Sequence, residues 1–234
     1  MKTQLQILLA WGVHLFTSMG ILAAFMALIA IDEGHFSNAF LWLFCCFIID
    51  GLDGSLARKF NVTEVLPNMH GKNIDYVIDF STYALIPAFF FYKANMVSDL
   101  LMYPALAVIL LSSALYYGKN NMVEDEQYFI GFPVLWNFVV FFQFFVFQNH
   151  LILNFVSVLI IGILHFVPLR YAYPSRARQY FIPHLLVSVL ALGAGLFILL
   201  QYPNIPLWPK CLTVFGGLYF FIFAIFETLK LRSK

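Results

Sequence analysis

The chain has 234 residues, of which 62% are hydrophobic and 11% are charged, and its formal net charge is +1. This composition excludes a water-soluble globular domain, because apolar runs of about 20 residues indicate membrane-spanning helices. We therefore expect an integral membrane protein in contact with membrane lipids, and we expect no nucleic-acid partner.

Apolar runs separated by proline, glycine, asparagine or charged residues predict eight helices. We expect these at 7–31, 37–56, 74–92, 100–117, 132–148, 151–167, 180–200 and 211–229. Only Gln148, Asn149 and His150 divide the fifth helix from the sixth, but the combined run is too long for one helix across a hydrocarbon core of about 30 Å. The sequence thus predicts an all-α polytopic membrane bundle of about eight transmembrane helices, with residues 1–234 forming a single domain.

Basic residues are distributed unevenly between the two sets of loops. Eleven of the thirteen lie at the termini or in the loops after the second, fourth and sixth helices, namely Lys2, Arg58, Lys59, Lys72, Lys119, Arg170, Arg176, Arg178, Lys230, Arg232 and Lys234. The opposite loops contain only Lys93 and Lys210. Because cytoplasmic loops are enriched in lysine and arginine, this bias places both termini and the loop between the second and third helices in the cytoplasm.

Four aspartates lie inside or beside the second and third apolar segments: Asp50, Asp53, Asp75 and Asp79. A charged carboxylate in a membrane segment costs at least ~2.5 to 3.5 kcal/mol, so such residues normally face a cavity, a metal or a partner charge. Spacings of three and four residues place each pair on one face of its helix. Divalent cations such as Mg²⁺ or Mn²⁺ bind oxygen ligands and would relieve the repulsion among four carboxylates, so we expect a metal site. Polar residues at helix ends are the alternative explanation.

The aspartates belong to a longer pattern that also contains small residues and one arginine. In order, it reads Asp50, two residues, Asp53-Gly54, two residues, Ala57-Arg58, twelve residues, Gly71, three residues, Asp75, three residues and Asp79. This pattern resembles the signature of the CDP-alcohol phosphotransferase family, and all eight of the fixed positions are present. The spacer of twelve residues, 59–70, is longer than in most of the family and is similar to that of bacterial phosphatidylcholine synthases. The downstream segment 129–133, Phe-Ile-Gly-Phe-Pro, resembles a loop shared by phosphatidylserine and phosphatidylcholine synthases.

The resemblance implies a transferase in a bacterial inner membrane, with its active site on the cytoplasmic side. It would move the phosphatidyl group of CDP-diacylglycerol to choline and release CMP; serine or another alcohol is the alternative acceptor. Two divalent ions, Mn²⁺ or Mg²⁺, would bind the aspartates and neutralise the diphosphate, and Asp79 would also act as the general base. Relatives are often homodimers. An ion-coupled transporter is the alternative from another class, but its acidic sites should lie near the bilayer midplane rather than beside one cytosolic loop.

The remaining signature residues are expected at the nucleotide. Gly54, Ala57 and Gly71 lack bulk where the cytidine would lie, which lets a ligand approach the backbone closely. Small residues also allow membrane helices to pack, so packing is the alternative. Arg58 offers forked donors suited to phosphate oxygens; otherwise it anchors the cytosolic end of its helix.

Choline is a quaternary ammonium, so its site should contain aromatic faces and a carboxylate. Aromatic candidates near the cytosolic helix ends are Tyr83, Tyr116, Tyr117, Phe132 and Trp136. Glu126 is the candidate carboxylate, although the acidic cluster 124–126 is also typical of a solvated loop. Phenylalanine in membrane cores and tyrosine and tryptophan at interfaces are common without any such site.

Overall fold

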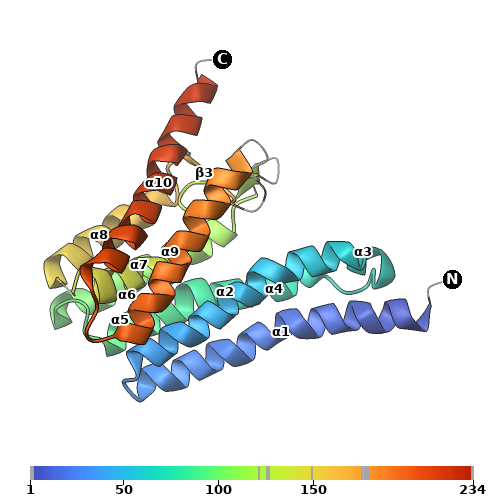
Figure 1. Ribbon diagram of the computed structural model, residues 1–234, viewed down its shortest axis with the longest axis horizontal. Helices are drawn as coiled ribbons and strands as arrows, with labels where there is room; N and C mark the ends of the chain where they lie inside the picture. Colours follow the sequence, from blue (N-terminus) through green and yellow to red (C-terminus); the bar gives the residue numbers. More distant parts are fainter. Residues whose placement is uncertain are drawn as a thin grey trace. The chain divides into compact units, whose positions relative to one another are not determined.

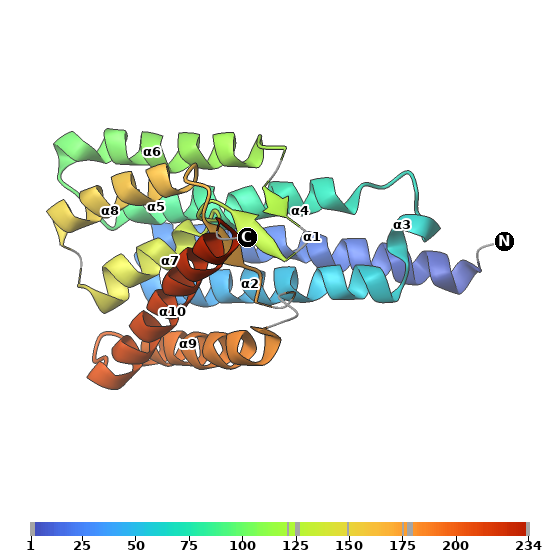
Figure 2. The same cartoon turned by 90° about the horizontal axis from the view of Figure 1, so that it is seen from above.

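The computed structural model describes residues 3–120, 122–124, 127–148, 150–174, 176 and 180–232. Its secondary structure is almost entirely helical, and the chain divides into two compact units, Met1–Ala94 and Asn95–Lys234. Figure 1 and Figure 2 show both units.

The first unit is built from three long helical segments and one short helix. Its elements are α1 (Gln4–Asp32), α2 (Phe36–Lys59), α3 (Val62–Val65), α4 (Gly71–Phe80), the π-helical turn η1 (Ser81–Leu85) and α5 (Ile86–Lys93). Thr3 begins α1 with a capping box, in which its hydroxyl accepts from the Gln6 N–H while the Gln6 side chain accepts from the Thr3 N–H. A tight turn at Gly34, with φ of +77°, reverses the chain so that α1 and α2 lie side by side (Figure 1).

Small residues on α1 bring the neighbouring helices close to it. Gly20, Ala23, Ala24 and Ala27 are all buried, as expected where membrane helices approach one another closely. A Cβ atom on Gly20 would lie 3.0 Å from Cγ2 of Ile78 on α4. The glycine therefore sets how near α4, with its aspartates, can lie to α1.

The second unit contains five apolar helical segments and a small sheet. The helical elements are α6 (Asp99–Tyr117), α7 (Trp136–Phe141), the π-helical turn η2 (Phe142–Val146), α8 (Leu151–Leu164), α9 (Phe181–Gln201) and α10 (Leu207–Arg232). The strands β1 (Val123–Glu124), β2 (Tyr128–Ile130) and β3 (Arg170–Ala172) pair antiparallel in the order β1-β2-β3. In register, Val123 lies opposite Phe129, which in turn lies opposite Tyr171. Within this unit α6 contacts α8, and α9 contacts α10 (Figures 1 and 2).

All eight predicted apolar segments are helical, but they differ in length. Within the described part of the chain, six helices are long and apolar enough to cross a membrane: 4–32, 36–59, 71–93, 99–117, 181–201 and 207–230. The fifth and sixth predicted segments form shorter apolar helices, at 136–146 and 151–164. The prediction of a polytopic helical membrane bundle is thus confirmed, with six long helices and two short ones in place of eight of similar length.

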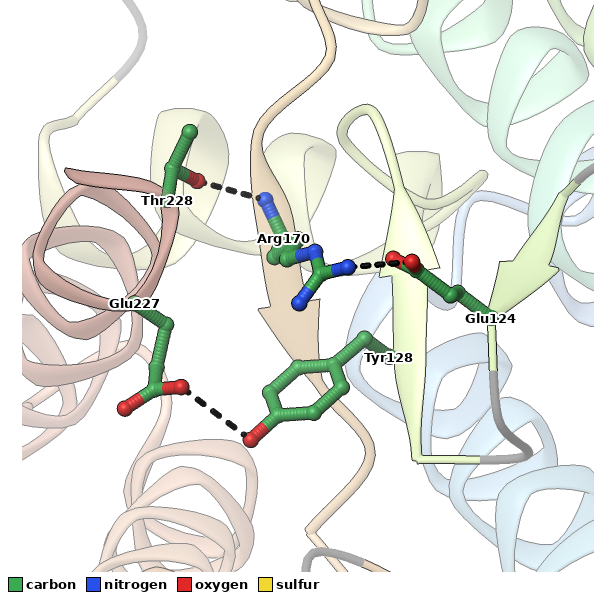
Figure 3. Close-up of polar contacts among 5 residues, drawn as sticks. All are labelled: Glu124, Tyr128, Arg170, Glu227 and Thr228. Atoms are coloured by element: carbon green, nitrogen blue, oxygen red, sulfur yellow. Dashed lines mark hydrogen bonds and ion pairs between the residues drawn. The ribbon is translucent and has the colours of Figure 1, made fainter. Parts of the chain in front are cut away.

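Polar side chains attach the small sheet to α10 (Figure 3). The guanidinium of Arg170 forms an ion pair with Glu124 of β1. The backbone N–H of Arg170 donates to Oγ1 of Thr228 at 2.9 Å. The Tyr128 hydroxyl donates to Oε2 of Glu227 on α10 at 3.3 Å. Because Glu227 and Thr228 are buried, these bonds fix the sheet and the C-terminal half of α10 to each other.

Candidate active site

Three of the predicted aspartates meet at one point in the first unit. Asp50 lies on α2, and Asp75 and Asp79 lie one turn apart on α4. One carboxylate oxygen from each of the three lies within 4.8 Å of the others, and all three residues are half-buried. The two spacings in the sequence therefore converge on a shared cluster.

The donor set fits a hard divalent cation. Metal–oxygen distances of about 2.0 to 2.6 Å place the ligands of one ion up to about 5 Å apart, which matches the separation in this cluster. Oxygen-only ligands also favour Mg²⁺ or Mn²⁺ over metals that prefer sulfur or imidazole. Without a cation, negative charges this close together in a half-buried position repel one another.

The fourth aspartate is oriented differently. Asp53 is buried, and its carboxylate accepts a hydrogen bond from the side chain of Thr17 on α1. The Asp79 carboxylate interacts with the charges of Asp50, Asp75 and Asp53, in that order of strength. Asp53 therefore belongs to the same electrostatic site, while its oxygens lie outside the close group of three.

The twelve-residue spacer between the two halves of the motif contains the short helix α3. Val62 and Val65 of α3 are buried against Ala10 and Val13 of α1. Ala57 packs against the same apolar cluster. This part of the spacer thus forms an apolar cover over the N-terminal part of α1.

The other signature residues lie on α2 and α4, the two helices that carry the aspartates. A Cβ atom on Gly71 would lie 3.0 Å from Cε1 of the buried His14, so this glycine allows α4 to begin in contact with α1. Arg58 is exposed, and its guanidinium donates to Oγ of Ser55 at 3.2 Å. Gly54 is half-buried. Gly71 and Ala57 therefore do serve helix packing, which was the alternative to a role at the nucleotide. A contact of these two residues, Gly54 or Arg58 with the nucleotide stays a prediction.

Tyr83 is the candidate aromatic residue that lies beside the aspartates. It follows Asp79 by four residues, and its hydroxyl donates to Oδ2 of Asp50 at 2.8 Å. The residue is buried within η1, where Ile86 N–H bonds to the carbonyl of Ser81 in the wider π-helical pattern. Pro87 has no N–H to offer the Tyr83 carbonyl, which explains a departure from regular α-helix here.

Three other aromatic candidates gather in the second unit, around His165. The ring of His165 lies 5.5 Å from that of Tyr116, 6.0 Å from that of Phe132 and 5.4 Å from that of Trp136. Tyr116 and Trp136 are almost completely buried, and Nε1–H of Trp136 donates to Oγ of Ser113 at 2.8 Å. Tyr117 lies next to this cluster, with its ring 6.5 Å from that of Tyr116. Glu126 lies outside the described residues.

A lysine already occupies one aromatic face in this cluster. The ammonium of Lys119 lies 4.8 Å from the centre of the Tyr116 ring and donates to the carbonyls of Ile130 at 3.1 Å and His165 at 3.3 Å. Such a position combines a cation–π contact with two hydrogen bonds. Lys119 thereby joins the end of α6 to β2 and to the end of α8.

The loop 129–133 passes through the same region and requires its glycine. Gly131 has a φ of +88°, and a Cβ atom there would lie 2.1 Å from the carbonyl oxygen of His165. The N–H groups of Gly131 and Phe132 donate to the carbonyls of Leu169 and Leu164, both at 2.9 Å. The loop is therefore held tightly against the end of α8.

His165 lies one residue beyond α8 and is fully buried. Nδ1 lies 2.6 Å from the carbonyl oxygen of Phe132, to which it donates as a neutral imidazole. Burial lowers the pKa of His165 to about 4, and the positive charge of Lys119 acts in the same direction. The ring is therefore neutral near pH 7, which suits its apolar surroundings.

Comparisons with known proteins show the family of the chain. The sequence model of the CDP-alcohol phosphatidyltransferase family matches residues 13–167, a range that includes the aspartate motif and the loop at Gly131. The chain belongs to this family. It is therefore a membrane enzyme of the phosphatidyltransferase class, and the transporter alternative is set aside.

Individual members of the family are similar over most of the chain. The phosphatidylcholine synthase of Agrobacterium fabrum is 37% identical over 212 residues, covering 91% of this chain and 88% of the relative. That of Pseudomonas aeruginosa is 36% identical over 214 residues, covering 89% and 90%. That of Borreliella burgdorferi is 30% identical over 233 residues, covering 98% and 99%.

Two polar residues of α1 contact the motif and were not predicted from the sequence. Thr17 bonds Asp53, and His14 contacts Gly71. They lie three residues apart, so both face the same side of α1, which is the signal that could have identified them. Their partners are remote in sequence, and pairing them with the motif required the packing of α1 against α2 and α4.

Proposed function

We propose that this phosphatidyltransferase makes phosphatidylcholine and CMP from CDP-diacylglycerol and choline. The convergence of Asp50, Asp75 and Asp79 within a motif typical of the family is the observation that carries the proposal. The names of the relatives favour choline as the acceptor, and so does the long spacer. Serine remains the alternative acceptor.

Asp50, Asp53, Asp75 and Asp79 would hold two divalent ions, Mn²⁺ or Mg²⁺. Such ions, when bound, neutralise the charge of the diphosphate and of the departing CMP. Asp53 supports a second ion because its buried charge lies near Asp79 without belonging to the group of three. Four carboxylates carry more negative charge than one divalent ion can neutralise.

The chain's own residues would handle the proton and the leaving group. Asp79, as the general base, takes the proton from the choline hydroxyl while the oxygen attacks the phosphorus that carries diacylglycerol. A new P–O bond forms to choline, and the P–O bond to CMP breaks. Gly54, Ala57 and Gly71 would leave room for the cytidine, and the exposed Arg58 would contact the phosphates.

The choline contacts stay a prediction. Tyr83 is supported by its contact with Asp50, and its ring could bind the ammonium through a cation–π contact. Tyr116, Tyr117, Phe132 and Trp136 lie at the second aromatic cluster, where Lys119 already covers the Tyr116 ring. Glu126 is proposed from the sequence alone.

We further propose that residues 1–234 act as one catalytic domain with the aspartates and both termini on the cytosolic side. The family match runs from residue 13 to residue 167, across the boundary between the two compact units, which supports a single functional domain. The distribution of lysine and arginine supports the orientation.

The direct test is CMP release by the purified protein with CDP-diacylglycerol, comparing choline, serine, inositol and glycerol 3-phosphate as acceptors. We expect release with choline alone, loss of activity after chelation, and recovery with Mn²⁺ or Mg²⁺. CMP release with serine instead of choline would show that serine is the acceptor. CMP release without a divalent metal would contradict the proposed metal site.

A variant tests the general base. We expect Asp79→Asn to abolish CMP release while the protein still folds, because the amide cannot accept the proton. Asp32→Asn is the matched control, since Asp32 is exposed and lies at the end of α1 in an ion pair with Lys93. Near-normal release by Asp79→Asn would remove this residue as the base.

A further inference from the structure

The site contains a hydroxyl that the family signature does not include. Tyr83 follows Asp75 and Asp79 at intervals of four residues, so the three share one face of the helical segment 71–93. Its side chain is only 6% exposed, and its hydroxyl lies 2.8 Å from Oδ2 of Asp50. A residue on the α4–α5 segment thus contacts the aspartate that α2 contributes.

The direction of this bond decides what it can do. A tyrosine hydroxyl donates to a carboxylate, so the bond stabilises ionised Asp50 and restricts the rotation of its side chain. Asp50 is the one member of the close group that comes from α2. A bond from the opposite segment therefore also fixes the distance between Asp50 and the pair on α4.

We propose that Tyr83 is a positioning residue, whose hydroxyl holds Asp50 in the orientation needed to bind the divalent ion. The inference rests on the proposed function, since it assigns a role within the same metal site. Hydrogen-bond partners that orient metal ligands typically contribute 10-fold to 100-fold to metal affinity. The hydroxyl and the ring have separable roles, because only the ring could contact choline through a cation–π interaction.

The test compares Mn²⁺ binding by the full-length wild-type protein and by Tyr83→Phe, both without substrates. Electron paramagnetic resonance of free Mn²⁺ gives the dissociation constant directly. We expect Tyr83→Phe to weaken binding by about 10-fold to 100-fold. Tyr92→Phe is the matched control and should bind as the wild type does, because Tyr92 is exposed on α5 of the same helical segment.

Kinetics then separate the hydroxyl from the ring. With Tyr83→Phe, the Mn²⁺ concentration for half-maximal CMP release should rise by the same factor, while the KM for choline at saturating Mn²⁺ stays unchanged. Thermal unfolding provides a second measurement, because Mn²⁺ at a fixed concentration should raise the unfolding temperature of Tyr83→Phe less than that of the wild type.

Every outcome decides the inference. Equal Mn²⁺ affinity in the wild type and Tyr83→Phe would overturn it, and so would a Phe variant that fails to fold, since the hydroxyl would then act on the fold. A wild-type protein that binds no Mn²⁺ would overturn it together with the metal site. If the wild type binds Mn²⁺ but does not transfer a phosphatidyl group to choline, the proposed acceptor is wrong. The Mn²⁺ affinities of the wild type and Tyr83→Phe still test the role of Tyr83 in that case.

Discussion

Alanine substitution of three glycines should separate backbone strain from steric overlap. Gly131 combines a φ of +88° with a Cβ position 2.1 Å from the His165 carbonyl oxygen. Gly34 has a similar φ, +77°, but no atom within 4 Å of its Cβ position. Gly193, in α9, has open space and no positive φ. The three sites therefore represent strain with overlap, strain alone, and neither.

The structure sets the expected size of each effect. A left-handed backbone costs an alanine about 1 to 2 kcal/mol, which is the whole expectation for Gly34→Ala. In Gly131→Ala the overlap also forces the backbone to move away from His165. This movement should weaken or break the two hydrogen bonds that the N–H groups of Gly131 and Phe132 donate to the carbonyls of Leu169 and Leu164. At about 0.5 to 1.5 kcal/mol for each bond, the total loss of unfolding free energy is about 2 to 5 kcal/mol. Gly193→Ala should be neutral or slightly stabilising, because alanine is the better helix former.

Thermal unfolding in detergent, followed by tryptophan fluorescence, measures the series. We expect the unfolding temperature to fall in the order Gly193→Ala, Gly34→Ala, Gly131→Ala. If Gly131→Ala unfolds at the same temperature as Gly193→Ala, the inference that the loop 129–133 is held tightly against the end of α8 is wrong. If it matches Gly34→Ala, the loop relaxes without losing its two hydrogen bonds.

Three further substitutions test other contacts. Because the pKa of His165 is lowered to about 4, the unfolded chain binds more protons at this residue between about pH 4 and pH 6.5, so the contribution of His165 to the unfolding free energy should rise with pH across this window by on the order of 3 kcal/mol. His165→Asn should therefore lose less stability than the wild type between pH 7 and pH 4.5, and equal losses would contradict the assignment. Lys119→Met removes the donor to the Ile130 and His165 carbonyls and should lower unfolding free energy by about 1 to 3 kcal/mol, an effect visible as a lower unfolding temperature. Lys93→Ala breaks the 2.8 Å ion pair with Asp32 and should change the unfolding free energy by less than about 1 kcal/mol, because the Asp32 carboxylate is exposed. A larger change would contradict the exposure of Asp32.

The long helices could be predicted because uninterrupted apolar runs leave few alternatives in a membrane. The short elements could not. Strands β1 to β3 have two or three residues each, too few for an alternating pattern, and α3 is a single turn of four residues inside the spacer. The turns η1 and η2 have the composition of ordinary membrane helix, so only the hydrogen bonds distinguish them.

The candidate site, like the fold, could be predicted from the sequence only in part. The spacing of the aspartates predicts which faces carry them, and the structure brings Asp50, Asp75 and Asp79 together. Spacing says nothing of contacts between helices, so the bond from Thr17 to Asp53 and the bond from Tyr83 to Asp50 were not predicted. The aromatic candidates were chosen by their level along the helices. The structure places Tyr83 in the first unit and the other described candidates in the second.

The π-helical turn η1 has a consequence for insertions and deletions in this segment. A π-turn holds an additional residue within one turn, and one residue of α-helix corresponds to a rotation of about 100°. The surplus residue therefore sets the rotational register of α5, with its buried Phe90 and Phe91, independently of the face that carries Asp75 and Asp79. A deletion within 81–85 that restored regular α-helix would leave the two aspartates in place but turn α5 away from its packing partners. Loss of one residue here should thus be tolerated less well than most substitutions at the same positions.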